Sequence, residues 1–138
     1  MKRFLNIFLH YPVSLLTLCV IVCLSLFRAP GDSSLKLFEH MDKVVHFLMY
    51  AFLSTVMWYE RYKACNRSVC FSLFVMSLIV PVLFSGLVEY LQDWLTDYRS
   101  ADFMDFVFNA AGVLFANAVC FFILRPLVDR ISKRKEIR

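Results

Sequence analysis

Four apolar runs separated by short polar segments are the feature that most constrains the fold of this chain. They cover Pro12–Phe27, Val44–Tyr59, Val69–Leu91 and Phe103–Leu124. A helix needs about 20 residues to cross the hydrocarbon core of a bilayer. The third and fourth runs reach that length, whereas the first two are shorter in their strictly apolar part. The pattern predicts membrane-spanning helices with hydrophilic loops between them.

The overall composition favours the same class of protein. Hydrophobic residues make up 60% of the 138-residue chain. A soluble domain of that size exposes too much of its surface to water to bury so large an apolar fraction. We therefore predict an all-α, polytopic membrane protein: a single domain over residues 1–138, with four transmembrane helices in a compact bundle.

The distribution of Lys and Arg predicts the direction of the spans. Eleven basic residues lie before the first run, between the second and third runs or after the fourth run, and four lie in the other two loops. The positive-inside rule then places both termini and the Arg61–Arg67 loop in the cytoplasm, with loops 28–43 and 92–102 facing outward. The first run is predicted to be a retained helix, because the following SLFRAPG has no small-x-small cleavage site of a signal peptide.

The charges and the cysteines argue against two common kinds of site. The formal net charge is +4, but the cations cluster at the ends of apolar runs and are not interleaved with stacking aromatic residues, so nucleic-acid binding is not expected. The five cysteines form no C-x-x-C pair and lie mostly within apolar runs, where cysteine behaves as a small hydrophobe. We expect neither a structural disulfide nor a cysteine metal site.

Polar side chains gather at the outer ends of three runs. At about 100° per residue on a helix, Asp42, His46 and Tyr50 fall within an arc of roughly 80°. Exposing an ionised Asp to lipid would cost roughly 2.5–3.5 kcal/mol at the bilayer centre. The polar faces of these helices are therefore expected to face one another. The sequence therefore predicts a polar cavity that opens to the outer face. Its other lining residues are Glu89 and Gln92, at the end of the third run, and Asp102, Asp105 and Asn109, leading into the fourth.

Two spaced motifs within these stripes resemble the VanZ-like family of small bacterial membrane proteins. DKVVHFLMY, residues 42–50, is similar to the family's D-K-x-x-H-F-x-x-Y. A second element of the family, E-x-x-Q followed by R-x-x-D-x-x-D-x-x-x-N-x-x-G, is matched by Glu89, Gln92, Arg99, Asp102, Asp105, Asn109 and Gly112. The likeness covers nearly the whole chain. One departure is DWLTDYR, residues 93–99, which lacks the proline that many members carry there.

The resemblance implies a place in the bacterial cytoplasmic (inner) membrane and a link to resistance to the glycopeptide antibiotic teicoplanin. The family has no settled biochemical activity, so the resemblance supplies no substrate, cofactor or catalytic residue. Its link to glycopeptides directs attention to the outer surface of the membrane, where peptidoglycan precursors of the cell envelope are exposed. The expected partners are membrane lipids and a polyprenyl-phosphate or peptidoglycan precursor.

His46 and Asp42 are the leading candidates for proton transfer. At this i,i+4 spacing the carboxylate favours the imidazolium and orients one ring nitrogen. His46 can therefore act as a general acid or base, and Asp105 and Glu89 complete the predicted catalytic set. A guanidinium such as that of Arg99 holds a phosphate through two parallel hydrogen bonds. The residues predicted to bind a ligand are Arg99, Gln92, Asp102, Asn109 and Tyr50.

Other interpretations of the same residues remain open. The carboxylates of Asp102, Asp105 and Glu89 could hold a divalent cation together with His46. The chain has no compact H-E-x-x-H motif, however, and no metal is predicted. The carboxylates could instead pair with Arg99 and Lys43 in a structural charge network. The chain would then be a non-catalytic binding or structural membrane protein. A transporter is the weakest alternative, because the polar residues do not continue to the inner face.

Several residues within the runs are assigned to helix packing. Pro81 removes a backbone donor in the middle of the third run, which predicts a kink there. Gly112 would let another helix approach the fourth run closely, and the deeper Asn117 is expected to hydrogen-bond across helices. Aromatic rings near the ends of the runs are expected at the membrane interface: Trp58, Tyr59, Tyr62, Trp94 and Tyr98.

Overall fold

The computed structural model describes residues 11–27, 41–66, 68–95 and 102–136, and within these ranges the chain is helical and has no β-strand. Four helical rods make up this described part, which confirms the all-α prediction. The first two rods are α2 (Pro12–Phe27) and α3 (Met41–Ala64). The other two each contain a π-helical segment: α4 (Phe71–Phe74), η2 (Val75–Ile79) and α5 (Val80–Leu95), then α6 (Phe103–Val119), η3 (Cys120–Leu124) and α7 (Arg125–Glu136).

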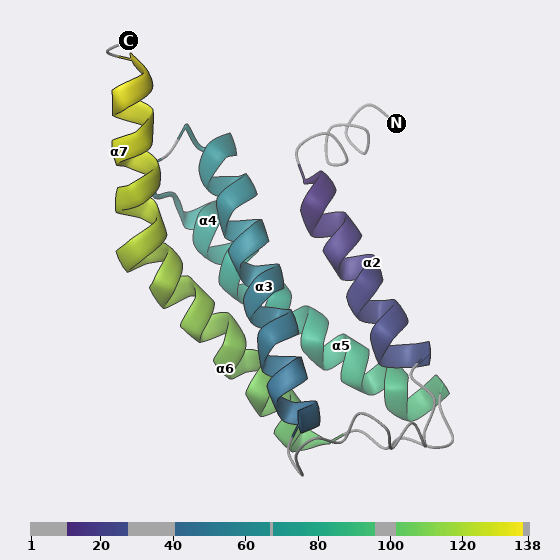
Figure 1. Ribbon diagram of the computed structural model, residues 1–138. Coiled ribbons are helices and arrows are strands. Elements are labelled where there is room, and N and C mark those ends of the chain that lie inside the picture. Colours follow the sequence, from purple (N-terminus) through teal and green to yellow (C-terminus); the bar gives the residue numbers. More distant parts are fainter. Residues whose placement is uncertain (1–10, 28–40, 67, 96–101, 137–138) are drawn as a thin grey trace, which may run out of the picture.

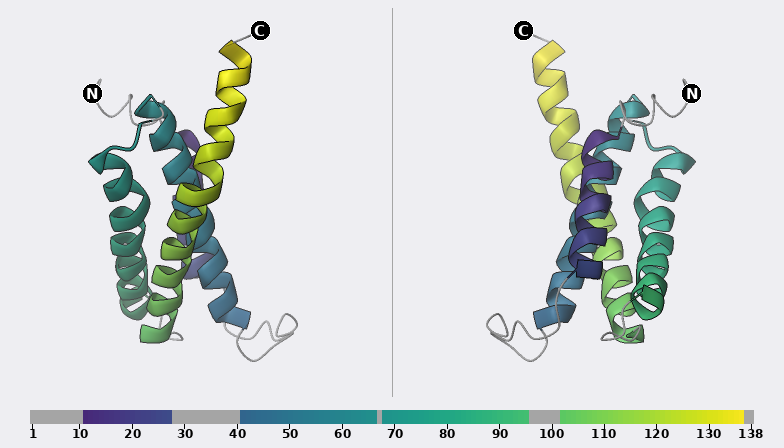
Figure 2. Two further views of the ribbon diagram at one scale, coloured as in Figure 1. Left: turned by 90° about the vertical axis from the view of Figure 1, so that its left-hand side faces the viewer. Right: turned by 90° about the vertical axis from the view of Figure 1, so that its right-hand side faces the viewer.

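The rods run alternately up and down and pack side by side (Figures 1 and 2). Helix α3 lies between α2 and α6 and packs along α6 (Figure 1). The start of α3, the end of α5 and the start of α6 share one end of the bundle, which we call the polar end. The opposite end, called the basic end, holds the start of α2, the end of α3 and helix α7 (Figure 1). Residues from three separate segments are thereby brought to a common depth at the polar end.

Two of the rods, Phe71–Leu95 and Phe103–Lys133, are long and apolar enough to cross a membrane. Helix α2 is apolar over Pro12–Leu26 but is shorter than these two rods. Helix α3 is long enough at 24 residues, but it carries Asp42 in its first turn and Arg61 and Lys63 in its last turn. By length and hydropathy, the described residues thus contain two candidate spans where the sequence analysis predicted four.

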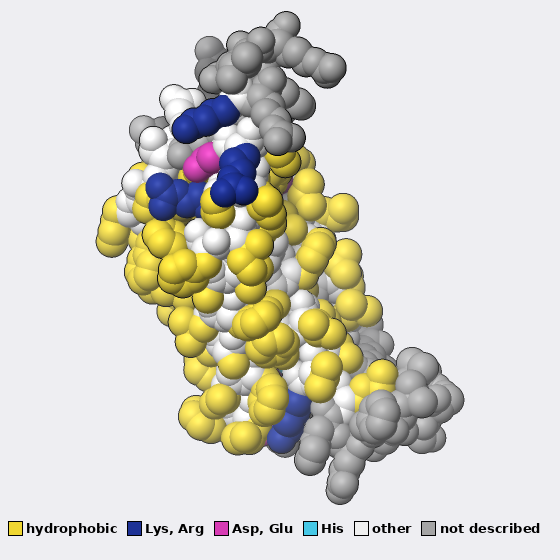
Figure 3. Space-filling model, turned by 60° about the vertical axis from the view of Figure 1, so that its left-hand side comes forward, with side chains coloured by type: hydrophobic (Ala, Val, Ile, Leu, Met, Phe, Trp, Pro, Cys, Tyr) yellow, Lys and Arg dark blue, Asp and Glu magenta, His cyan; other side chains and the backbone are white. Residues whose placement is uncertain are grey.

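Hydrophobic side chains cover the middle of the bundle. On the face shown in Figure 3 they form a broad band, and most of the visible Lys and Arg side chains group near one end. Large apolar side chains point outward from the rods, among them Leu83 at 68% exposed, Phe115 at 57% and Phe122 at 75%. A continuous apolar surface of this kind is stable against lipid rather than water. The surface therefore agrees with the membrane class that composition predicted.

Trp58 and Tyr62, which the sequence analysis placed near the membrane interface, point into the bundle, and their depth in a membrane stays a prediction. They are 2% and 0% exposed, and their rings stack with centroids 4.6 Å apart. The Tyr62 hydroxyl donates a hydrogen bond to Asp129 Oδ1 on α7 at 2.7 Å. Because α7 continues beyond the apolar run and supplies this acceptor, the hydroxyl of Tyr62 does not need to reach the lipid headgroups.

A buried hydrogen-bond network joins α3, η2 and α6 next to Pro81. Proline has no N–H to donate to the carbonyl four residues earlier, which here belongs to Ser77. That carbonyl accepts instead from Ser54 Oγ on α3 at 2.7 Å and from Asn117 Nδ2 on α6 at 2.9 Å. The π-helical segment η2 ends two residues before the proline, and the rod changes direction in this region in Figure 1. The structure confirms the distortion predicted at Pro81 and the cross-helix role predicted for Asn117.

We predict that Asn117→Leu lowers the free energy of unfolding by about 1–3 kcal/mol, because the Ser77 carbonyl and the Ser54 hydroxyl each lose a buried partner. Thermal unfolding in detergent, followed by circular dichroism, measures the change. Leu114→Ala is the control, since this side chain on the same helix is 59% exposed. Its effect should stay within about 0.5 kcal/mol. Equal losses in the two variants would contradict a role for the network in stability.

Candidate functional site

Three helices bring polar side chains together at the polar end. Helix α3 contributes Asp42 and His46, α5 contributes Glu89, and α6 contributes Asp105 and Asn109. Within α3 and within α6 the two residues are four positions apart, so each pair lies on one helical face. We call these five side chains the polar cluster.

His46 is at the centre of the polar cluster. Its Nδ1 lies 3.2 Å from Asn109 Oδ1 and 4.0 Å from Glu89 Oε1. Its Nε2 faces the other way and lies 3.8 Å from Asp105 Oδ2. Asn109 Nδ2 donates to the same Glu89 oxygen over 3.4 Å. The imidazole is therefore held between carboxylates from two different helices, with one amide linking all three helices.

The amide of Asn109 determines which nitrogen of His46 carries a hydrogen. An ionised Glu89 carboxylate only accepts hydrogen bonds, so the Asn109 amide turns its nitrogen toward Glu89 and its oxygen toward His46. The amide oxygen is also only an acceptor, so Nδ1 of His46 is the donor. Nε2 is then the nitrogen that can exchange a proton with Asp105 or with a bound molecule.

The polar cluster is nearly closed to solvent. His46 and Asp105 are each 4% exposed, Glu89 is 6% exposed and Asn109 is fully buried. Asp42 is only half-buried and forms the rim of the cluster. Tyr50, one turn further into α3 than His46, is fully buried, and its hydroxyl has no hydrogen-bond partner within the described part of the chain. Asp42 is therefore the most accessible of the five side chains.

The remaining residues predicted to bind a ligand are placed differently. Gln92 is fully buried, and its Nε2 donates to the backbone carbonyl of Ser25 at 3.0 Å, which joins α5 to α2. Asp102 is exposed and caps the start of α6, where its carboxylate accepts from the Met104 amide at 2.8 Å. Arg99 lies outside the described residues. Ligand binding by these three residues remains a prediction.

Three members of the polar cluster could hold a metal ion. Single ligand atoms of Asp42, His46 and Asp105 all lie within 4.8 Å of one another. Two carboxylates and one imidazole suit magnesium, manganese or zinc. The set differs from the one considered in the sequence, which contained Asp102 and Glu89 in place of Asp42. Asp102 is used as a helix cap, and Glu89 lies on the Nδ1 side of His46, away from Asp105.

Sequence reasoning missed the contribution of α2 to this end of the bundle. The prediction placed the polar cavity among the last three spans, but the Gln92–Ser25 contact brings the end of α2 beside α5. The acceptor in this contact is a backbone carbonyl, which every residue has. No pattern of side chains could have indicated it.

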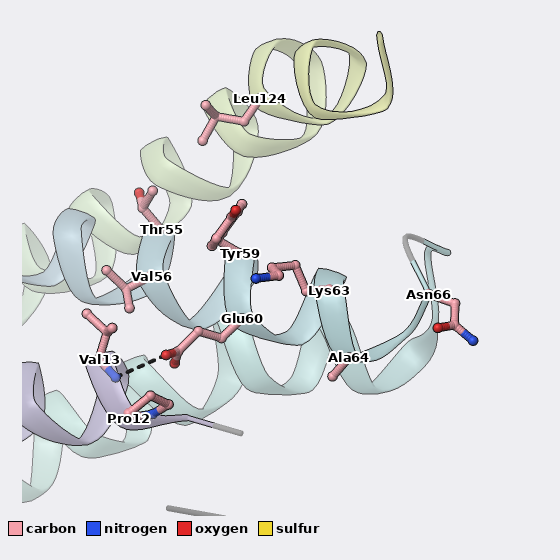
Figure 4. Close-up of a pocket in the computed structure, with 10 residues that line it drawn as sticks. All are labelled: Pro12, Val13, Thr55, Val56, Tyr59, Glu60, Lys63, Ala64, Asn66 and Leu124. Carbon is pink, nitrogen blue, oxygen red and sulfur yellow. Dashed lines mark hydrogen bonds between the residues drawn. The ribbon is translucent and has the colours of Figure 1, made fainter. Parts of the chain in front are cut away.

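A separate groove of about 810 Å³ lies at the basic end, lined by residues of α2, α3 and η3 (Figure 4). Glu60 of α3 reaches across it, and its carboxylate accepts from the Val13 amide at 3.0 Å and from the Ser14 amide at 3.2 Å. Amides in the first turn of a helix have no partner within that helix, so Glu60 caps α2 from its neighbour. Glu60 is about 20 Å along α3 from His46 at 1.5 Å per residue, so the groove is separate from the polar cluster.

The fold and the polar cluster together define a helical membrane protein that buries ionisable side chains at one end of its bundle. Within that class, a family model described as VanZ/LLP1 matches residues 10–125, and the chain belongs to this family. The match confirms the resemblance seen in the two motifs, and family membership suggests a link to resistance. No curated protein and no solved structure matches the chain.

Proposed function

We propose that the chain is a four-span protein of the bacterial cytoplasmic membrane whose polar cluster binds and acts on a phosphate-bearing amphiphile at the outer leaflet. A polyprenyl-phosphate or a peptidoglycan precursor has this chemistry. One observation carries the proposal: the nearly buried His46 is held at Nδ1 by Asn109 and presents Nε2 to Asp105. A histidine that is fixed in this way, away from bulk water and beside a carboxylate, is suited to proton transfer.

The charges at the two ends of the bundle support the proposed orientation. Arg61, Lys63 and Arg125 lie at the basic end, and the positive-inside rule favours the cytoplasm for such an end. The polar cluster would then lie toward the outer leaflet. In this arrangement α3 also spans the membrane, because its Asp, Glu, Lys and Arg residues all lie within five residues of either end. Helix α2 would complete the four-span bundle.

Each residue has a distinct role in this proposal. His46 exchanges a proton with the reacting group through Nε2, and Asp105 orients the ring and stabilises the imidazolium. Asp42 at the rim and Glu89 on the Nδ1 side assist by favouring the charged ring. Arg99, in the segment before α6, would hold the phosphate through paired hydrogen bonds.

A second candidate function is a non-catalytic role, and one observation favours it. The two amides at this end of the bundle both bond protein groups: Asn109 joins α6 to α3 and α5, and Gln92 joins α5 to α2. Contacts of this kind also hold transmembrane helices together without any ligand. The polar residues would in that case fix the packing of a binding or structural protein.

Two isosteric substitutions separate these functions. His46→Gln keeps a donor for Asn109, and Asp105→Asn keeps the shape of the carboxylate, but neither variant retains the original proton-transfer pair. We expect both variants to fold and to lose the cell-envelope phenotype. Gel filtration of the detergent-purified protein measures folding, and the teicoplanin susceptibility of cells that express the chain measures the phenotype.

Asp129→Asn is the matched control, because it neutralises a carboxylate at the basic end, where Asp129 accepts from Tyr62. It is expected to fold and to retain the wild-type phenotype. A wild-type phenotype in cells carrying His46→Gln would reject the catalytic proposal. Loss of folded protein in both polar-cluster variants would favour the structural alternative.

A further inference from the structure

Two cysteine thiols meet at the basic end of the bundle, remote from the polar cluster. Cys65 directly follows α3, and Cys70 directly precedes α4. The Sγ of Cys70 lies 3.2 Å from the hydroxyl oxygen of Ser72, and the Sγ of Cys65 lies 3.9 Å from the same oxygen. One hydroxyl group therefore brings the two thiols to the same place. Both cysteines are partly exposed, so small reagents in water can reach them.

A tight turn holds the two cysteines together. The Asn66 amide donates to the Lys63 carbonyl at 3.2 Å, and the Ser68 amide donates to the Cys65 carbonyl at 3.0 Å. Asn66 has a φ of 50°, in the left-handed region that asparagine tolerates better than most residues. The chain thereby reverses direction within a few residues and brings the ends of α3 and α4 close together.

A guanidinium group supports one of the two thiols. Arg61 donates from Nε to the Ser72 hydroxyl oxygen at 2.8 Å and from a terminal nitrogen to the Tyr11 hydroxyl at 2.9 Å. With its oxygen accepting from Arg61, the Ser72 hydroxyl is free to donate its own hydrogen to Cys70. This chain of donors ends on the sulfur of Cys70 and favours its anionic form.

The two thiols are therefore chemically unequal. Hydrogen bonds from Cys65 and then from Ser72 lower the pKa of Cys70 to about 7, while the contact with Cys70 raises the pKa of Cys65. The lowered pKa favours the thiolate form of Cys70 near neutral pH, and the raised pKa of Cys65 favours its protonated form. A reactive thiolate beside a protonated thiol is the arrangement in which one cysteine is oxidised first and its neighbour resolves the product.

We propose that Cys65 and Cys70 form a reversible dithiol–disulfide site that is oxidised by hydroperoxides. The Cys70 thiolate attacks one oxygen of hydrogen peroxide, the O–O bond breaks, and Cys70 becomes a sulfenic acid as hydroxide leaves. The Cys65 thiol then attacks the sulfenic sulfur, the S–S bond forms, and the hydroxyl group leaves with the thiol proton as water. A small dithiol such as dithiothreitol reverses the reaction and is itself oxidised to a cyclic disulfide. The bond would join the end of α3 covalently to the start of α4.

The sequence between the two cysteines allows a direct test. Trypsin cleaves after Lys63 and Arg67, so Cys65 falls in the peptide ACNR and Cys70 in the peptide that begins at Ser68. After the full-length protein in detergent is treated with hydrogen peroxide, mass spectrometry is expected to find these two peptides joined, and dithiothreitol should separate them. Two outcomes would overturn the proposal. In one, the ACNR peptide is recovered unlinked after Cys70 has been fully oxidised; in the other, ACNR is linked to the peptide that contains Cys19 and Cys23.

The rate of alkylation tests the difference between the two thiols. In the untreated protein, the alkylation of Cys70 by iodoacetamide is expected to be half-maximal near pH 7. Ser72→Ala should move that midpoint upward, and at pH 7 alkylation of Cys70 should slow several-fold. Cys70→Ser should abolish the peroxide-dependent link, whereas Cys120→Ser, which removes a buried cysteine elsewhere, should leave it intact. A midpoint for Cys70 near the ordinary cysteine value of about 8.5 would overturn the assignment of the nucleophile.

Discussion

Replacing Gly112 with alanine is expected to eliminate most of the folded protein. Gly112 of α6 lies so close to α3 that an added methyl group would overlap the carbonyl oxygen of Phe47. The methyl carbon would also lie 3.1 Å from the Phe47 carbonyl carbon and 3.2 Å from its Cα. These are backbone atoms of a helix and cannot rotate away, so the two helices must separate. We expect the free energy of unfolding to fall by at least about 3 kcal/mol, the upper part of the usual range for overpacking.

The same substitution should also disturb the polar cluster. Phe47 directly follows His46 on α3, and Asn109 lies one turn before Gly112 on α6. A separation of the helices at Gly112 would lengthen the 3.2 Å contact between His46 Nδ1 and Asn109 Oδ1. Any Gly112→Ala protein that still folds should therefore lose the envelope phenotype as well.

Gly86→Ala is the matched control for this prediction. Gly86 is also a helical glycine, but a methyl group there would lie 3.5 Å from a ring carbon of Phe106, which is an ordinary van der Waals distance. Alanine has the better helix propensity, so this variant should be unchanged or more stable by up to about 1 kcal/mol. Yield after gel filtration and the melting temperature compare the two variants. Equal stability of Gly112→Ala and Gly86→Ala would show that α3 and α6 do not pack as closely as described.

Helical periodicity explains why much of the polar cluster could be predicted. Residues four apart share a helical face, so Asp42 with His46, and Asp105 with Asn109, had to present their side chains together. The cost of ionised groups in lipid then required those faces to turn inward. The structure confirms this arrangement, with His46 and Asp105 each 4% exposed. The sequence was therefore sufficient to identify the faces and the end of the bundle where they meet.

The atom-to-atom partners could not be predicted, because they depend on how the helices are rotated against one another. Nothing in the spacing indicates that Asn109 bonds both His46 and Glu89, or that Gln92 bonds a backbone carbonyl of α2. The Cys65–Cys70 contact was missed for a related reason. The sequence showed two cysteines in a C-x-x-x-x-C spacing, and only the turn at Asn66 brings their sulfur atoms to one serine hydroxyl.

His46→Leu is expected to cause the largest loss of stability among substitutions in the polar cluster. Leucine is apolar and removes the group that lies 4.0 Å from Glu89 and 3.8 Å from Asp105. Removing one member of a buried ionic group typically costs 3–5 kcal/mol, because a charge then remains in surroundings of low dielectric constant without that partner. We predict a fall of about 3 kcal/mol in the free energy of unfolding. Thermal unfolding in detergent measures it, and His46→Gln should lose less because its amide can still donate to Asn109.

A double-mutant cycle shows whether this loss comes from charge. In His46→Leu with Glu89→Gln, one of the carboxylates beside the lost imidazole is neutral, so part of the stability should return, with a coupling energy of about 0.5–3 kcal/mol. Glu89→Gln alone should cost less than His46→Leu, because the new amide oxygen can still accept from Asn109 Nδ2. Combining His46→Leu with Asp129→Asn at the basic end should give additive effects, since distant sites do not couple. If the Glu89 pair is additive as well, electrostatic attraction between His46 and Glu89 does not hold this end of the bundle together.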